Sequence, residues 1–388
     1  MKNFSISLIK YSLFLLAVFI PFSTSGIGIS VSLLTVGVLI FYLSGGNFIY
    51  IPDKETKKIF YFMLGIILIM ILSTLFSYDL VSSIKRTITV LGYFFIFASV
   101  FEMDDKEYLK KVIYVLIFLC VLHSIYAIFQ YFTGLDIVKK GYEKYDRVIG
   151  IVGHFNSLAG ILGVIFPVLF CLFYFLKNKK VILGISSILM LFAIVLTFTR
   201  GIWLGIIGAM FIIGLLADRR IFLILIVFIL ILLIIPSTKK RIKETFNERN
   251  GTTRIMFLKE TPKLILKRPI LGFGPDSFKK VFYEKNPNFP EKGHFHPHNM
   301  YLHIMFELGV VGLILFLYLF YEMIKNLLMI YNSTTENFVK FLSLGALGSI
   351  IVFLIYGLVD EPFRAHFAPY GLFFLLSISY RLGLLEQK

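Results

Sequence analysis

The sequence is poor in charge and in cysteine. Charged residues make up 16% of its 388 residues, against about 25% in soluble domains, whereas 58% are hydrophobic. This composition excludes a soluble globular enzyme and a disordered chain. Its two cysteines, Cys120 and Cys171, both lie inside apolar runs, so the sequence indicates neither a disulfide framework nor a metal–thiolate site.

Acidic residues are also few. The chain has 23 Asp and Glu against 39 Lys and Arg, a formal charge of +16. In a soluble protein this excess would suggest nucleic-acid binding, but here the basic residues lie in short runs between apolar stretches. Membrane topology explains that pattern better, and we expect membrane lipids rather than nucleic acid as partners.

The apolar stretches predict an all-α, polytopic integral membrane protein. A helix needs roughly 20 apolar residues to cross a bilayer, and on this basis the sequence predicts about twelve transmembrane helices. They cover about 7–22, 26–43, 58–76, 86–101, 111–132, 148–176, 181–199, 201–217, 220–235, 299–324, 338–359 and 366–382. The chain then divides into nine N-terminal spans (1–235), one long loop (236–298) and three C-terminal spans (299–388).

The distribution of Lys and Arg predicts the orientation. If the N-terminus is cytoplasmic, 17 of the 39 lie in cytoplasmic segments, 8 in short outer loops and 14 in the long loop. Because long loops are largely exempt from the positive-inside rule, the short segments decide. They predict that both termini are cytoplasmic and that the long loop is outside.

Two apolar stretches are too long for one span each. Residues 181–217 would form a continuous helix of about 55 Å, so we expect a turn at Thr199-Arg200-Gly201, facing outward. Residues 148–176 are expected to break near His154–Ser157. The interiors of the spans carry almost no ionisable groups, with His123 the main exception, whereas ion-coupled transporters usually place charge at mid-membrane.

Two arginines are candidates for binding an anion. Arg200 lies between two apolar helices, where it either snorkels to the interface or holds an anion. Arg254 lies in the long loop, which carries 14 basic and six acidic residues, a net +8. From Arg254 the apolar spacing predicts an amphipathic helix on the membrane surface. A planar guanidinium binds phosphate oxygens bidentately, which favours these arginines over the lysines.

The long loop ends with three alternating histidines, His294, His296 and His298. They could bind a metal, but no acid lies close in sequence and a proline interrupts the set, so no metal or other cofactor is expected. His298, at the start of an apolar helix, is better suited to taking a proton from a hydroxyl. Asn299 could cap that helix or orient the imidazole.

The arrangement of these motifs resembles a known family. His298-Asn299 is followed after nine residues by Gly309-Val-Val-Gly312. An arginine-led Pro-x-x-Gly-x-Gly-x-x-x-Phe segment precedes it, with Pro269, Gly272, Gly274 and Phe278. Together with the Thr-Arg-Gly turn and the twelve-span layout, these motifs resemble the O-antigen ligase family.

The resemblance implies a GT-C type membrane glycosyltransferase in the bacterial inner membrane, with its active site in the periplasmic loop. Such enzymes move a glycan from undecaprenyl diphosphate to a sugar hydroxyl of the lipid A-core, without a metal. By motif, His298 would match the histidine proposed to activate the acceptor, and Arg200 and Arg254 the arginines that hold the donor diphosphate. The sequence offers further candidates for the same pocket: Arg147, Arg86, His154, His296 and Asp360.

Two other functions remain open at this point. A polysaccharide polymerase of the same superfamily would share the architecture, although a single histidine motif at the loop's end and the lack of an appended soluble domain favour a ligase. A lipid-linked oligosaccharide transporter would also need a basic cavity. It would be expected to carry cationic groups through the spans, whereas here they stop at the outer face.

Overall fold

A computed structural model of the protein describes residues 1–46, 54–138, 141–142, 147–176, 180–234, 236, 238–239, 248–287, 289, 296–364 and 366–386. Within these residues the chain is almost entirely helical, and the only strands are β1 (Leu135–Asp136) and β2 (Gly141–Tyr142), an antiparallel pair. The prediction of an all-α polytopic membrane protein is confirmed.

Nine described helices are long and apolar enough to cross a membrane. They are α1 (Lys2–Phe19), α2 (Thr24–Leu43), α3 (Lys54–Leu75), α4 (Leu80–Phe101), α5 (Lys106–Thr133), α6 (Phe155–Phe175), α13 (Met300–Ser333), α14 (Asn337–Gly357) and α15 (Phe367–Glu386). Three shorter apolar helices complete the set: α7 (Lys180–Leu196), α8 (Arg200–Leu216) and α9 (Ile221–Ile234). These twelve helices occupy the twelve predicted positions; α7 and α8 have 17 residues each, at the lower limit of a span.

Both predicted breaks are present. The long stretch 181–217 is divided into α7 and α8 by Thr197–Thr199, so Arg200 begins a helix instead of lying inside one. The stretch 148–176 becomes helical only at Phe155, with His154 as the N-cap of α6. Gln130 and His123 on α5 hold the non-helical segment before it, because their side chains accept hydrogen bonds from the backbone NH groups of Gly150 and Ile151.

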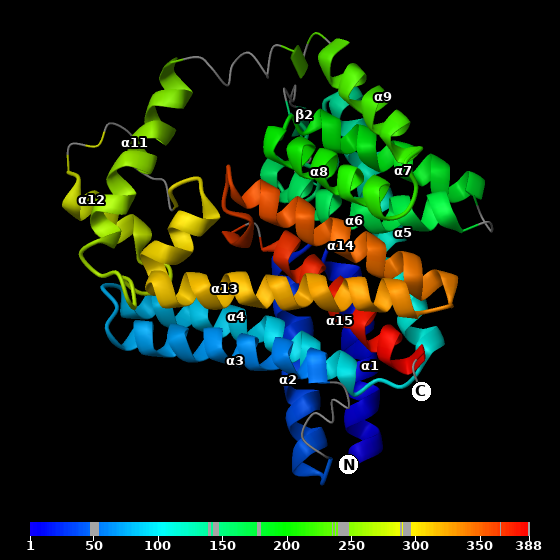
Figure 1. Cartoon of the computed structure of the whole chain (residues 1–388), viewed down its shortest axis with the longest axis horizontal. Helices are drawn as coiled ribbons and strands as arrows, with labels where there is room; N and C mark the ends of the chain where they lie inside the picture. The colour runs from blue at the N-terminus through cyan, green and yellow to red at the C-terminus, as the bar shows by residue number, and fades with distance from the viewer. Residues whose placement is uncertain are drawn as a thin grey trace.

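The connections fall into two groups at opposite ends of the helices. At one end, ion pairs join the N-terminal half to the last helices and to the connection between α4 and α5: Lys10–Asp105, Arg381–Asp104, Lys106–Glu386 and Lys325–Glu55. At the other end lie α11 (Glu248–Ile265), α12 (Phe278–Lys285) and the short 3-10 helix η2 (Pro362–Arg364). Figure 1 shows α11 and α12 beside the left-hand end of α13, a helix that packs along α3.

The apolar face of α11 packs on protein. Phe257 and Leu264 are buried against α12 and α13, in a cluster that contains Phe278, Phe282 and Phe306. The sequence predicts the amphipathic helix correctly, but its apolar face is covered by the two neighbouring helices and not by a membrane surface alone.

A kink in α13 is interlocked with the segment Pro269–Gly274. Gly309 has φ +68°, and the NH of Val310 donates to the Pro269 carbonyl at 2.7 Å. In return the NH of Phe273 donates to the Phe306 carbonyl at 3.0 Å. The Gly309-Val-Val-Gly312 motif, which could have served close helix packing, thus places a backbone kink in the N-terminal part of α13, beside the polar site.

Candidate functional site

Asp360 is the centre of a buried polar cluster that joins three helices. It follows α14, the helix that packs against α6, α8 and α13. Its Oδ2 accepts hydrogen bonds from Asn156 Nδ2 on α6 and from the Tyr356 hydroxyl, both at 2.9 Å. Its Oδ1 lies 3.6 Å from His298 Nδ1 and 3.9 Å from His296 Nε2. The structure therefore brings together Asp360, His298 and His296, three of the residues predicted from the sequence.

Electrostatics keep Asp360 ionised. Burial raises the pKa of the Asp360 carboxyl, but the nearby imidazoles of His298 and His296 outweigh burial and hold that pKa well below its usual range. The carboxylate is thus a fixed negative charge against which a histidine can be oriented.

His298 is held in an unusual backbone conformation. Its φ is +55°, a left-handed value that non-glycine residues rarely adopt. Asn299 caps α13, with its Oδ1 accepting from the Leu302 NH at 2.9 Å and its Nδ2 donating to the Leu358 carbonyl at 3.0 Å. This confirms the capping prediction for Asn299. Strain of this kind persists where the surroundings fix a side chain for function, and Phe198 and Asp276 at the same end share it.

His296 supports His298 as a neutral imidazole. Its Nδ1 accepts a hydrogen bond from the His298 NH at 3.3 Å, and the two rings are 4.6 Å apart. Burial lowers the pKa of His296 from 6.5 to about 4.

This shift predicts how stability depends on pH. The unfolded chain takes up a proton at His296 near pH 6.5, the folded chain only near pH 4, so the stability contributed by neutral His296 is complete above pH 6.5 and is lost as the pH falls toward 4. The loss amounts to at most about 3 kcal/mol. We expect thermal unfolding in detergent to shift to lower temperature across this window and the His296→Gln variant to show a flatter profile; an equal slope in both would contradict the assignment.

A second buried cluster lies beside the first. His303 Nε2 is 2.9 Å from Glu307 Oε1, and His303 Nδ1 is 3.0 Å from Glu361 Oε2. Both ring nitrogens can donate only when the imidazole carries two protons, so the arrangement suits a cation between two carboxylates. Glu361 directly follows Asp360 in the segment between α14 and η2. This segment therefore supplies a carboxylate to each cluster.

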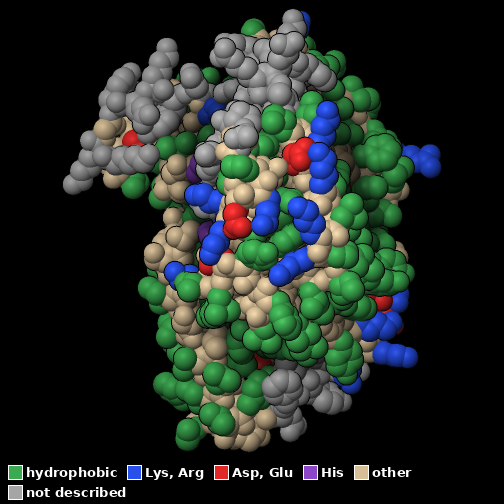
Figure 2. Space-filling view, turned by 90° about the vertical axis from the view of Figure 1, so that its left-hand side faces the viewer, with side chains coloured by type: hydrophobic (Ala, Val, Ile, Leu, Met, Phe, Trp, Pro, Cys, Tyr) green, Lys and Arg blue, Asp and Glu red, His purple; other side chains and the backbone are tan. Residues whose placement is uncertain are grey.

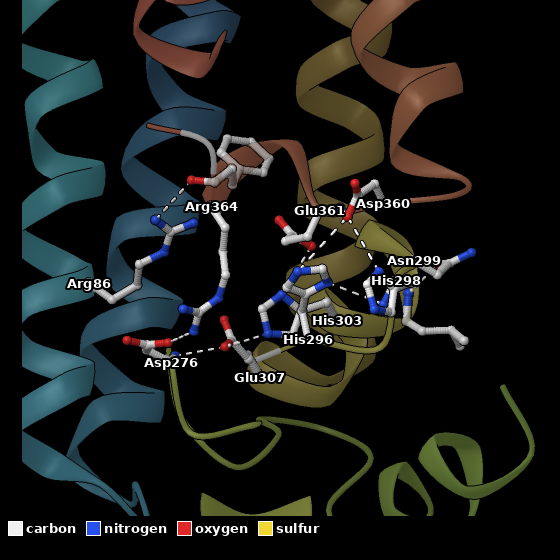
Figure 3. Close-up of polar contacts among 12 residues, drawn as sticks. Arg86, Asp276, His296, His298, Asn299, His303, Glu307, Asp360, Glu361 and Arg364 are labelled. Carbon is white, nitrogen blue, oxygen red and sulfur yellow. Dashed lines mark hydrogen bonds and ion pairs between the residues drawn. The ribbon is translucent and has the colours of Figure 1, made fainter. Parts of the chain in front are cut away.

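Two arginines lie on the far side of this second cluster. Arg364 pairs with Asp276, whose NH donates to Glu307 Oε1 at 2.7 Å. Arg86, near the start of α4, donates from NH1 to the Phe363 carbonyl at 3.3 Å. Figure 3 shows Arg86 and Arg364 on one side of Glu307 and His298 on the other.

Arg147 braces the Thr-Arg-Gly turn. Its Nε donates to the Thr197 carbonyl at 2.8 Å, its NH2 donates to Thr199 Oγ1 at 3.2 Å, and its guanidinium carbon lies 3.3 Å from the centre of the Phe155 ring. Thr199 Oγ1 also donates to Asn156 Oδ1 at 3.2 Å, and Asn156 in turn donates a hydrogen bond to Asp360. Arg147 thereby connects the turn that carries Arg200 to the Asp360 cluster.

Three further candidates from the sequence lie outside the two clusters. They are Arg200, Arg254 and His154. Arg200 is half-buried at the first position of α8, and Arg254 is exposed on α11. Arg254 lies one helical turn before Phe257, whose ring is 6.1 Å from that of His298. Burial lowers the pKa of His154, which accepts a hydrogen bond from the Asn156 NH at 3.2 Å. The face shown in Figure 2 gathers Lys and Arg side chains among fewer acidic ones.

The acid beside the histidines is Asp360, a candidate from the sequence that lies far from them along the chain. The ligand atoms of His296, His298 and Asp360 all lie within 4.8 Å of one another, which is close enough for a metal ion. The absence of a neighbouring acid in the sequence is therefore no argument against metal binding. The donor set can hold a metal, and His294 lies outside the described residues.

Sequence reasoning missed His303, Glu307 and Glu361 as a group. A signal was present, because His303 and Glu307 are four residues apart in an otherwise apolar helix and such pairs share a face. The expectation that the spans lack ionisable residues is thus wrong for α13. The link to Glu361 could not be read from sequence, because 54 residues separate it from Glu307.

Together, the fold and the site define a polytopic membrane protein whose polar groups converge at one end of its helices. A family model described as O-antigen ligase matches residues 185–317, a range that contains Arg200, Arg254 and His298. Over this range the chain is similar to the O-antigen ligase family.

Individual relatives agree with this assignment. An O-antigen ligase of Salmonella typhimurium is 25% identical over 305 residues, which cover 71% of this chain and 72% of the relative. A putative polysaccharide ligase of Rickettsia felis is 46% identical over 82 residues, and one of Rickettsia conorii is 41% identical over 80 residues. Each of these shorter matches covers about a fifth of either chain.

Proposed function

We propose that the protein is a glycosyltransferase of the ligase type, which transfers a glycan from undecaprenyl diphosphate to a sugar hydroxyl of the lipid A-core. The observation that carries this proposal is the His298–Asp360 pair beside a set of arginines at one end of the helices. Similarity to the O-antigen ligase family supports the reaction class.

In this mechanism His298 is the general base. Asp360 faces Nδ1, so the proton of the neutral ring resides there and Nε2 is left to accept a proton. The acceptor hydroxyl oxygen attacks the anomeric carbon of the donor while its proton passes to His298. The bond from that carbon to the diphosphate oxygen breaks, and its electron pair leaves with the diphosphate. A single displacement of this kind inverts the anomeric configuration.

The arginines supply electrostatic stabilisation. Negative charge grows on the leaving diphosphate, and guanidinium groups fixed nearby lower the energy of that transition state. We assign this role to Arg200 and Arg254, with Arg86 as a further contributor. Arg147 acts by holding the turn that presents Arg200, because its own donors are engaged by Thr197 and Thr199.

We further propose that this end faces the periplasm and that the protein lies in the bacterial inner membrane. Lys–Glu pairs join the start of α5 to the end of α15, and the start of α3 to α13. These ends carry basic runs that the positive-inside rule assigns to the cytoplasm. Both termini are then cytoplasmic, and α11 and α12 belong to the periplasmic segment 236–298.

Reconstitution of the reaction tests the function. The purified protein in detergent is incubated with undecaprenyl-diphosphate glycan, with or without lipid A-core, and the products are resolved by mass. We expect glycan on the lipid A-core and none without it. Growth of the donor chain would indicate a polymerase, and no transfer in either mixture would contradict both enzymes. We expect EDTA to leave transfer unchanged, since no step requires a metal; loss of activity restored by a divalent cation would assign one to His296, His298 and Asp360.

A further inference from the structure

The donor atoms of His296, His298 and Asp360 are spaced nearly as a zinc ion requires. His298 Nδ1 and His296 Nε2 lie 3.6 Å and 3.9 Å from Asp360 Oδ1, and the ligand atoms of all three residues lie within 4.8 Å of one another. Ligand atoms of a tetrahedral zinc site, with bonds of about 2.0–2.2 Å, are about 3.3 Å apart. Adjustments of about 1 Å or less at each side chain bring the three atoms to that spacing. Figure 3 shows both imidazoles beside the Asp360 carboxylate.

The Asp360 carboxylate is already oriented for such an ion. Its Oδ2 accepts hydrogen bonds from Asn156 and Tyr356, each at 2.9 Å, so Oδ1 is the oxygen that faces the histidines. Oδ1 accepts one hydrogen bond, from the Glu361 NH, and a carboxylate oxygen keeps a second lone pair for a cation. Hydrogen bonds of this kind behind a ligand fix its direction in metal sites.

Charge and access also favour a cation here. Among their described residues, the two clusters hold the carboxylates of Asp360, Glu361 and Glu307 against one imidazolium, that of His303. The side chains of His296 and His298 are 17% and 19% exposed, so an ion can reach them. Two imidazoles and one carboxylate suit Zn²⁺, whereas Mg²⁺ and Ca²⁺ prefer sets made of oxygen alone.

We propose that His296, His298 and Asp360 form a zinc site that inhibits the protein. Zinc on His298 Nδ1 takes the place of the proton that faces Asp360, and the neutral ring then carries its proton on Nε2. That nitrogen can no longer accept the proton of the acceptor hydroxyl. His296 moves its proton from Nε2 to Nδ1 and gives up the long 3.3 Å hydrogen bond from the His298 NH. The inhibition rests on the proposed function, because it acts through His298 as base, whereas zinc binding does not.

Zinc binding to the purified protein tests the site without requiring transfer. The protein is prepared without a histidine tag, freed of metal with EDTA, which is then removed, and titrated with Zn²⁺ against a chromophoric chelator. We expect one ion per chain and an affinity lowered about tenfold or more in His296→Gln. His154→Gln is the matched control, because His154 lies near the cluster but outside the three ligands, and its affinity should stay within about twofold of the original. Equal affinities in the two variants, or no binding to the original protein, would overturn the proposal.

X-ray absorption at the zinc edge decides the case in which His296→Gln fails to fold. In the original protein we expect nitrogen and oxygen ligands at about 2.0–2.2 Å, with the outer scattering of two imidazoles. A shell of oxygen atoms without imidazole would mean an adventitious ion only and would refute the site.

Glycan transfer separates the site from its effect. Saturating Zn²⁺ should lower transfer by about 10²-fold or more, the loss expected when a general base is blocked, and EDTA should restore it. Undiminished transfer by the zinc-bound protein would refute the inhibition. If zinc binds to these residues but no glycan is ever transferred, the proposed function fails while the zinc site stands.

Discussion

Replacing His298 by alanine is expected to reduce glycan transfer by about 10²–10⁴-fold, the usual contribution of a positioned general base. The variant loses the only imidazole nitrogen that faces away from Asp360 and toward the acceptor in the proposed mechanism. Asp360 keeps its contacts with Asn156 and Tyr356, so the cluster retains most of its connections. Transfer rates at saturating donor and acceptor measure the effect.

The control for this prediction is His298→Asn. Asparagine tolerates a positive φ and can still donate a hydrogen bond to Asp360, but it cannot accept a proton at neutral pH. It should therefore unfold at the temperature of the original protein while being as inactive as His298→Ala. Substantial transfer by either variant would remove His298 from the role of base.

Replacing Gly309 by alanine is expected to disrupt the N-terminal part of α13. An alanine Cβ would overlap the Ile270 carbonyl group, and φ +68° is itself unfavourable for a side chain, at a cost of about 1–3 kcal/mol. Relief of the overlap requires the segment Pro269–Gly274 to separate from the kink, which would break its hydrogen bonds with Phe306 and Val310. Because His303 and Glu307 lie immediately before the kink, transfer should be lost together with thermal stability.

Gly28→Ala provides the comparison for Gly309→Ala. Gly28 also lies in a membrane helix, but an added Cβ there meets no atom within 4 Å. We expect its unfolding temperature and activity to match those of the original protein. If Gly309→Ala keeps the unfolding temperature and activity of Gly28→Ala, the kink at Gly309 is not required for stability or transfer, which contradicts the prediction.

Local signals in the sequence predict much of this structure. Apolar length and polar breaks place the twelve helices, because the bilayer imposes nearly the same length on every span. The turn before Arg200 follows from the same constraint, and Asn299 as a helix cap follows from its position before an apolar run.

The sequence offers Asp360 as a candidate for the pocket of His298, but local signals do not predict the contact between the two side chains. Asp360 reaches it from 62 residues further along the chain, because α14 packs among α6, α8 and α13 and delivers its C-terminal end to that place. The three-residue spacing of Gly309 and Gly312 is equally consistent with close helix packing and with a kink, and only the hydrogen bonds with Pro269 and Phe273 distinguish them. Long-range packing, and not local propensity, assembles the site.

The anomeric configuration of the transferred sugar tests the mechanism most directly. The linkage in the product is compared by NMR with that in the undecaprenyl-diphosphate donor. Direct attack of the acceptor hydroxyl, with His298 as base, predicts that every newly formed bond has the opposite configuration to the donor bond. Retention would require a covalent intermediate or a second displacement and would contradict the mechanism proposed for this protein.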